Sequence, residues 1–152
     1  MRMDQFDRKI ITALQRNGAQ TNQELSDTVG LSPSQISRRR QQLESDGIIE
    51  GYAARLSAEK LGFGVRVFVH VALAAHSPDN SRRFAELVQR TPEILEAHAL
   101  TGDSDYLLKI VVRNLKDLSR LINETLLPHD SVDRVRSEIV LETLKESAAL
   151  PV

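Results

Sequence analysis

Apolar residues recur at helical spacing along the first part of the chain. A first predicted helix begins after Asp4, whose carboxylate can cap it, and ends near Asn17 with Gly18 as its C-cap. A second, shorter helix covers residues 23–29 and starts at Thr21 or Asn22. The first helix has its apolar residues on one face, and they are Phe6, Ile10, Ile11 and Leu14. In the second, Leu25 and Val29 are four positions apart.

A tight turn and a strong helix start follow. Gly30 permits the positive φ that the turn needs, and the apolar Leu31 is expected to pack into the core. Ser32 can cap the free N–H groups of a third helix, and Pro33 has no N–H to leave unpaired at its first position. A short helix, a turn with Gly and another helix form the helix-turn-helix pattern, whose second member is the recognition helix.

The third predicted helix buries few residues and exposes many polar ones. Ile36 and Leu43 are seven positions apart and share its buried face, and Gly47 ends it. Its other side chains are mostly polar, with three consecutive Arg at positions 38–40. For such a helix in isolation, a solvated charged face is the simplest interpretation.

The helix-turn-helix context instead predicts binding to double-stranded DNA. Arg side chains contact phosphates, and Gln or Arg can read base edges in the major groove. The predicted contacts are Ser32, Ser34, Gln35, Ser37, Arg38, Arg39 and Gln42. Of these, we expect Arg38 and Arg39 to contact phosphates, and Ser34, Gln35 and Ser37 to lie nearer the bases.

The chain after the third helix is expected to complete this domain. Residues 48–56 suggest two short strands around Gly51, which would form a wing. We therefore predict a winged helix-turn-helix over residues 1–52 and a linker over 53–64, with one helical turn that Gly62 closes.

The hydrophobic pattern changes to a period of two after Gly64. Val or Leu stands at every second position from 65 to 73, as in a half-buried strand. Helices are expected from the Ser77-Pro78 start to Thr91 and from the cap Asn114 to Pro128. Further strands are predicted over 94–101, 106–113 and 132–145.

This order of elements is the ferredoxin-like βαββαβ arrangement, an antiparallel sheet with both helices on one face. The predicted fold class of the chain is α+β, with the second domain at residues 65–152. The other sheet face would also carry apolar side chains, which are Phe68, Ala72, Leu107 and Val111. A second copy of the chain is the simplest cover for it, and a two-fold dimer would match a palindromic DNA site.

Composition and charge narrow the function classes. The chain has 152 residues, a net charge of −1 and no Cys, which excludes disulfides and thiolate zinc ligands. No apolar run approaches the ~20 residues of a membrane span and no secretory segment opens the chain, so we expect a cytoplasmic protein. We predict no metal site, because no ligand spacing links His70, His76, His98 and His129, and no cofactor or catalytic motif is present. A near-neutral chain attracts DNA weakly, so we expect an oligomer.

The order and spacing of several motifs resemble the Lrp/AsnC (leucine-responsive, feast/famine) family of transcription regulators. The residues that carry the resemblance include Asp7-Arg8-Lys9-Ile10, Asn22-Gln23-Glu24-Leu25, Val29-Gly30-Leu31-Ser32-Pro33-Ser34, Gly47-Ile48-Ile49-Glu50-Gly51-Tyr52, Thr101-Gly102-Asp103-Ser104-Asp105-Tyr106-Leu107-Leu108 and Glu124-Thr125-Leu126-Leu127. The resemblance implies a sequence-specific regulator, not an enzyme, whose assembly or DNA binding responds to a small effector, usually an amino acid. It also implies a homodimer that assembles further to a tetramer or octamer.

The resemblance places the effector between subunits, beside a Gly-x-x-Asp loop. The implied contacts are Thr101, Gly102, Asp103, Ser104, Asp105, Tyr106 and Leu107. The chemistry of the loop suits an amino acid, because backbone N–H groups can hold an α-carboxylate and Asp103 or Asp105 can hold an α-ammonium. From the spacing alone, a hairpin turn is the alternative, since turns favour the same Gly, Asp and Ser.

Two places depart from the family's pattern. Arg40 stands where members commonly have an aliphatic residue, so either its stem crosses the core and its head reaches a phosphate, or the helix is rotated. Residues 128–132 read Pro-His-Asp-Ser-Val, where the family often has Leu-Pro-Gly-Val. Because this loop borders the expected effector pocket, the identity of the effector does not follow from the resemblance.

Two other functions use a similar scaffold. Some haem-pathway decarboxylases resemble this family and surround a tetrapyrrole with His and Arg side chains, but the intact, well-capped recognition helix argues against an enzyme. The other alternative is a ligand-binding assembly module that no longer binds DNA, which Arg38 and Arg39 disfavour.

Overall fold

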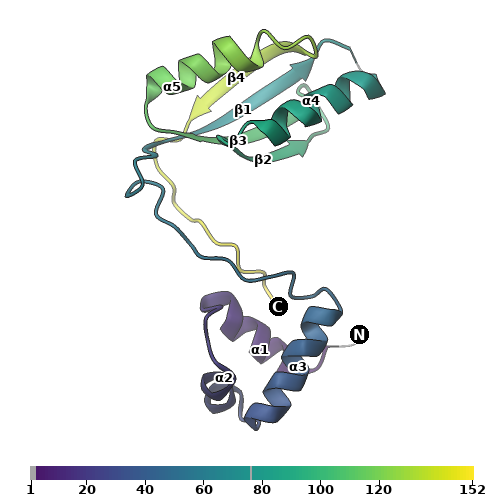
Figure 1. Ribbon diagram of the computed structural model, residues 1–152, viewed down its shortest axis with the longest axis vertical. Coiled ribbons are helices and arrows are strands. Elements are labelled where there is room, and N and C mark those ends of the chain that lie inside the picture. Colours follow the sequence, from purple (N-terminus) through teal and green to yellow (C-terminus); the bar gives the residue numbers. More distant parts are fainter. Residues whose placement is uncertain (1–2, 76) are drawn as a thin grey trace. The chain divides into compact units, whose positions relative to one another are not determined.

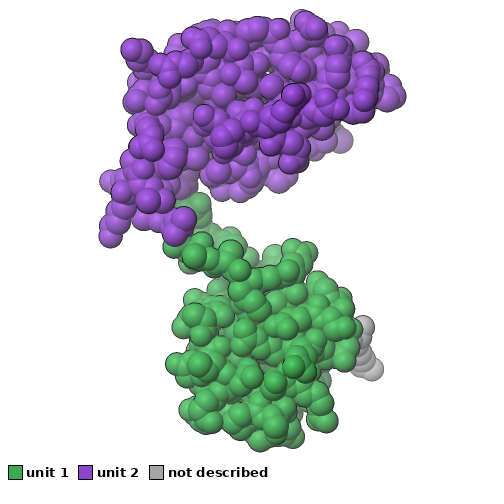
Figure 2. All heavy atoms as spheres, viewed as in Figure 1, with its two compact units in different colours: residues 1–55, 145–152 green, residues 56–144 purple. Residues whose placement is uncertain are grey.

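The structure, a computed structural model, describes residues 3–75 and 77–152 and divides into two compact units. The N-terminal unit contains the chain up to Arg55 together with Lys145–Val152, and the C-terminal unit contains Leu56–Leu144 (Figures 1 and 2). The sequence analysis instead places residues 145–152 in the second domain. In the structure, the side chain of Gln15 exchanges hydrogen bonds with the main-chain N–H and carbonyl of Leu150.

The N-terminal unit, as far as it is described, contains the three predicted helices, which are α1 (Gln5–Arg16), α2 (Asn22–Val29) and α3 (Pro33–Ser45). Asp4, Thr21 and Ser32 cap them, each within a capping box that pairs the cap with the third helical residue. Gly30 ends α2 with a φ of +82°. The apolar faces meet in one core, formed by Ile10, Ile11, Leu14, Leu25, Val29, Ile36 and Leu43.

The first helix ends differently from the prediction. The cap is Asn17 rather than Gly18, because the N–H of Asn17 donates to the carbonyl of Ala13. The side-chain oxygen of Asn17 accepts a hydrogen bond from the N–H of Ala19, just after the helix. The φ of Gly18 is not positive, so this position does not depend on the conformational freedom of glycine.

The predicted wing strands are wrong. Residues 46–64, all of which the structure describes, contain no strand, and the chain runs through Gly51 in an irregular conformation. The N–H groups of Ile48 and Ile49 both donate to the carbonyl of Leu43, so they close the end of α3 instead of starting a strand. A lone two-stranded ribbon is only marginally stable, so a pattern of alternating residues was not sufficient to form one.

The C-terminal unit has the predicted βαββαβ topology. Its strands are antiparallel and follow the order β2-β3-β1-β4, with β1 at Val65–Leu73, β2 at Ile94–Ala99, β3 at Tyr106–Val112 and β4 at Val132–Ile139. Helices α4 (Pro78–Arg90) and α5 (Leu115–Arg120) cover one face of the sheet (Figure 1). The core between the two layers includes Val67, Val69, Val71, Phe84, Leu108, Ile110, Leu118 and Leu126.

Two elements of this unit are shorter or less regular than predicted. The helix that Asn114 caps changes after α5 into a π-helical turn, η1 (Leu121–Leu126). β4 ends at Ile139 instead of reaching residue 145, because Ile139 pairs with Val67 close to the start of β1. The next N–H, of Val140, still donates to the carbonyl of Arg66, and there β1 offers no further length for pairing.

The sheet face away from the helices, here called the open face, combines apolar and charged side chains. Its members come from alternate positions of β1 and β3. Of the four apolar residues predicted for this face, Phe68, Ala72 and Leu107 are half-buried and Val111 is buried. Lys109 lies beside Phe68 in the register, and its ammonium binds the carboxylate of Glu96 at 2.8 Å. This ion pair holds the pKa of Glu96 below its usual value, and His98 contributes to the same shift.

Gly30→Ala tests the turn of the helix-turn-helix. Because a side chain in the left-handed conformation is strained, we expect the free energy of unfolding of the N-terminal unit to fall by about 1–2 kcal/mol. Urea unfolding followed by circular dichroism measures the effect. Gly51→Ala is the matched control, since its φ is not positive and its added Cβ would meet open space, and it should change stability little. Equal stability of the two variants would contradict the strain argument.

Candidate nucleic-acid interface and effector loop

Helix α3 exposes a polar side opposite a fully buried one. Ile36 and Leu43 are 0% exposed, whereas Ser34, Arg38 and Gln41 form a stripe of exposed side chains four and three positions apart. The prediction missed Gln41, although its spacing from Arg38 indicates the same helix face. Of the three consecutive Arg at positions 38–40, Arg38 is the exposed one, and the other two are half-buried.

Ser32 and Gln35, predicted as DNA contacts, also build the start of α3. The side-chain oxygen of Gln35 accepts the N–H of Ser32 at 3.0 Å, and the hydroxyl of Ser32 accepts the N–H of Gln35 at 3.3 Å. The Oγ of Ser34 lies 3.1 Å from that of Ser32. Near the other end of α3, the exposed Gln42 donates to Asp46 at 2.7 Å, and Ser37 is half-buried.

Arg39 lies on the α1 side of α3, although the sequence predicts it as a phosphate contact. Its Nη1 is 2.9 Å from a carboxylate oxygen of Asp4 and 2.7 Å from one of Asp7. The guanidinium also stands 5.5 Å from the centre of the Phe6 ring. The prediction could not separate Arg39 from Arg38, because its acidic partners are more than thirty positions away in the sequence.

Arg40 connects α3 to the chain that leaves this unit. Its Nε donates to the hydroxyl of Tyr52 at 2.8 Å, and its Nη1 donates to the carbonyl of Gln20 at 3.2 Å. The hydroxyl of Tyr52 in turn donates to Glu44 at 2.8 Å, and burial raises the pKa of Tyr52 above its usual value. The departure from the family's aliphatic residue therefore gives an intramolecular anchor, with the ring of Tyr52 packed on the guanidinium.

The predicted effector residues lie in the loop between β2 and β3 and at the start of β3. Gly102 has a φ of +114°, which favours glycine at this turn. Thr101 and Asp103 are exposed, and Ser104 is half-buried. Not all of the predicted effector residues face the loop. The ring of Tyr106 packs on Phe84 in the core, with 4.8 Å between the ring centres.

Asp105 has a structural role that the sequence did not indicate. Its carboxylate accepts the N–H of Leu73 at 2.7 Å, and its own N–H donates to the carbonyl of Val71. Its carbonyl accepts the N–H of Leu100. Asp105 thus ties the end of β1 to the loop, which leaves Asp103 as the exposed carboxylate of the pair.

The loop before β4 lies at the same end of the sheet. The carbonyl of Ser131 accepts the N–H of Ala74, just beyond β1, and the N–H of Ser131 donates to the ring of His129. Ser131 is 0% exposed, and its Oγ has no hydrogen-bond partner among the described residues. The loop at 128–132 is therefore held next to the end of β1, to which Asp105 also binds.

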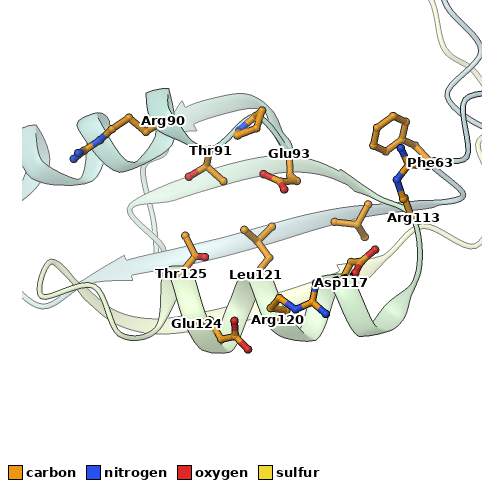
Figure 3. Close-up of a pocket in the computed structure, with 12 residues that line it drawn as sticks. Phe63, Arg90, Thr91, Glu93, Arg113, Asp117, Arg120, Leu121, Glu124 and Thr125 are labelled. Atoms are coloured by element: carbon orange, nitrogen blue, oxygen red, sulfur yellow. Dashed lines mark hydrogen bonds and ion pairs between the residues drawn. The ribbon is translucent and has the colours of Figure 1, made fainter.

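A pocket of about 460 Å³ opens elsewhere in the C-terminal unit, at the end of the sheet where Val112 ends β3. Figure 3 shows Thr91 and Glu93 on one side of it and Leu121 and Thr125 of η1 on the other. None of the predicted effector residues lines it. The described residues also contain no His, Cys, Asp and Glu group suited to a metal ion, and His76 lies outside them.

Known proteins with similar sequences cover almost the whole chain. The pattern of a winged helix-turn-helix DNA-binding domain matches residues 3–50, and that of the Lrp/AsnC ligand binding domain matches residues 66–150. The leucine-responsive regulatory proteins of Escherichia coli K12 and Klebsiella pneumoniae are each 40% identical to the chain over 148 residues, which is 97% of the chain and 90% of the relative. Of the described residues, no helix is long and apolar enough to cross a membrane.

Solved structures agree with this relationship. A transcriptional regulator of Neisseria meningitidis in complex with L-Met has a TM-score of 0.96 and 41% identity, with 99% of this chain and 97% of that one covered. An AsnC family regulator of Agrobacterium tumefaciens has a TM-score of 0.92 and 34% identity, with 98% and 97% covered. The helix-turn-helix, the βαββαβ unit and these matches lead to one conclusion: the chain belongs to the Lrp/AsnC family of DNA-binding transcription regulators, which are not enzymes.

Proposed function

We propose that the exposed side of α3 enters the major groove of double-stranded DNA. The observation that supports this is the exposure of Arg38 on the side of α3 opposite the buried Ile36 and Leu43. Arg38 contacts phosphates, and the polar side chains on this surface are Ser32, Ser34, Gln35, Ser37, Gln41 and Gln42. Arg39 is left out of the phosphate contacts because Asp4 and Asp7 hold it. Chromosomal DNA is the target of such a regulator, so we also propose a cytoplasmic location.

We propose that two copies of the chain pair through the open face. Phe68, Ala72 and Leu107 are half-buried there, and the helices cover only the other side of the sheet. A two-fold dimer brings two copies of α3 to successive major grooves about one helical turn apart. Because each copy brings its own DNA contacts, pairing also offsets the weak attraction of one near-neutral chain to DNA. The family relationship supports further assembly to tetramers or octamers.

We propose that an amino acid binds at residues 101–107 and modulates assembly or DNA binding. The relative from Neisseria meningitidis is a complex with L-Met, which supports this class of ligand. The exposed carboxylate of Asp103 can hold an α-ammonium, and N–H groups of the loop can hold an α-carboxylate. Leu107 extends the site toward the open face, so a bound effector can favour one assembly, with a coupling of about 1–3 kcal/mol.

Arg38→Ala removes one phosphate contact from each bound copy of α3. We expect weaker binding to duplexes of any sequence, and a slope of log affinity against log salt that decreases by about one for each bound copy. Fluorescence anisotropy over a salt series measures both quantities. Arg90→Ala, an exposed Arg in the C-terminal unit, is the matched control and should leave the slope unchanged. An unchanged slope for Arg38→Ala contradicts the proposed interface.

Phe68→Glu places a carboxylate in the open face beside Lys109, where a single copy of the fold tolerates it. In a dimer the same charge would be desolvated, so we expect dissociation to monomers in analytical ultracentrifugation. Leu115→Glu changes an exposed apolar residue at the start of α5 and should keep the dimer. A dimeric Phe68→Glu variant would show that the open face is not the interface.

Asp103→Ala removes the proposed partner of the effector's ammonium. With L-Met as the first probe in a calorimetric titration, we expect the affinity to fall about tenfold or more, since a hydrogen bond to a charged group contributes ~1.5–3 kcal/mol. DNA binding without the amino acid should be unchanged. Asp105→Ala is the comparison, and it should lower the stability of the C-terminal unit even without a ligand, because it frees the N–H of Leu73. An Asp103→Ala variant that binds L-Met normally excludes this role.

A further inference from the structure

The three consecutive Arg of α3 have three different surroundings. Arg38 is exposed, Arg39 is bound to acidic residues at the start of α1, and Arg40 is bound to Tyr52 and the carbonyl of Gln20. A helix turns by about 100° per residue, so neighbouring side chains necessarily point in different directions. The cluster around Arg39 joins α3, the recognition helix, to α1.

The carboxylates of Asp4 and Asp7 each divide their two oxygens between two tasks. Oδ1 of Asp4 accepts the N–H groups of Phe6 and Asp7, and its Oδ2 receives Arg39. Oδ2 of Asp7 accepts the N–H of Asp4 at 3.0 Å, and its Oδ1 receives Arg39 at 2.7 Å. The two carboxylates of the α1 capping box therefore also bind the guanidinium of Arg39 on α3.

Burial makes this arrangement difficult to release. The side chain of Asp7 is 6% exposed and that of Arg39 is 29% exposed. If Arg39 turned outward to a phosphate, a nearly buried carboxylate would lose its countercharge, which is strongly unfavourable. The hydrogen bond to Asp7 raises the pKa of Arg39 above its usual value, and the backbone N–H of Asp7, followed by Arg39, keeps the pKa of Asp4 below its usual value.

We infer that Arg39 is a positioning residue, which fixes the orientation of α3 on α1 through Asp4 and Asp7 and makes no contact with DNA. This inference rests on the DNA interface proposed above. The neighbouring Arg residues then have different roles: Arg38 contacts a phosphate, and Arg39 fixes the orientation of α3. Asp7, which is nearly buried in α1, then affects DNA binding without touching DNA.

DNA affinity as a function of salt tests this division in the full-length chain. The variants are Arg39→Gln, Asp7→Asn and their combination, and the probe is a duplex that the unmodified chain selects from a random-sequence pool. We expect both single variants to weaken binding by roughly tenfold and the double variant to be no weaker than Arg39→Gln, because the two residues act as one unit. The slope against salt should stay at the value of the unmodified chain in all three.

If the inference is wrong, Asp7→Asn does not weaken DNA binding. If Arg39 grips a phosphate, Arg39→Gln decreases the slope by about one per copy, and Asp7→Asn leaves affinity equal or tighter because it frees the guanidinium. Arg38→Ala in the same series separates this failure from a failure of the interface, since it must decrease the slope if α3 binds DNA at all.

A further variant covers the case in which Arg39→Gln does not fold. Arg39→Lys keeps the charge but replaces the guanidinium fork with a single ammonium, so we expect an affinity between those of the unmodified chain and Asp7→Asn. Circular dichroism at the start of each titration establishes that the helices are present. An Arg39→Lys variant with the full affinity of the unmodified chain, together with a neutral Asp7→Asn, would overturn the inference.

Discussion

The burial of two side chains on α3 determines which side of that helix is exposed. Ile36 and Leu43 are fully buried among residues of α1 and α2, and each contributes about 1.5–3 kcal/mol by leaving water. The rest of α3 is polar and has no comparable reason to face the core. The orientation of the exposed stripe is therefore set by apolar packing. The ion pairs of Arg39 with Asp4 and Asp7, and the hydrogen bonds of Arg40 to Tyr52 and to the carbonyl of Gln20, add contacts that agree with it.

The sheet of the C-terminal unit has a related constraint. Helices cover only one of its faces, and the other retains half-buried Phe68 and Leu107 within a frame of charged side chains. The same unit collects the β2–β3 loop and the loop before β4 at one end of the sheet, where Asp105 and Ser131 tie them to the end of β1. This arrangement would link the proposed assembly to the proposed effector site, because Leu107 follows the loop directly and lies on the open face.

The sequence predicted the elements whose signals are local. Asp4, Ser32, Ser77 and Asn114 each cap a helix as predicted, and Thr21 is the cap of the two predicted for α2. These signals are local, because a cap acts on N–H groups two or three residues away. The alternation from Val65 to Leu73 predicted β1 within its observed bounds, since each second side chain enters the core. The βαββαβ order followed from the same period changes.

The features that the sequence did not predict concern interactions between distant parts of the chain. The wing strands and the end of β4 depended on pairing partners, which an alternating pattern does not supply. Arg38 and Arg39 are the same residue type at neighbouring positions, so the sequence does not distinguish them. The packing of α3 on α1 places Asp7 beside Arg39. In the predicted effector loop, the sequence does not distinguish Asp103 from Asp105. In the structure, Asp105 is the one that accepts the N–H of Leu73.

The hydrogen bonds between Gln15 and the main chain of Leu150 give the molecule an inserted topology. The C-terminal unit is enclosed in sequence between two pieces of the N-terminal unit, so two covalent connections join them. A break before β1 would leave the C-terminal unit joined covalently only to residues 145–152, which bind Gln15 through two hydrogen bonds. A segment fused to the C-terminus would therefore be attached to the helix-turn-helix unit and not to the unit that contains the sheet.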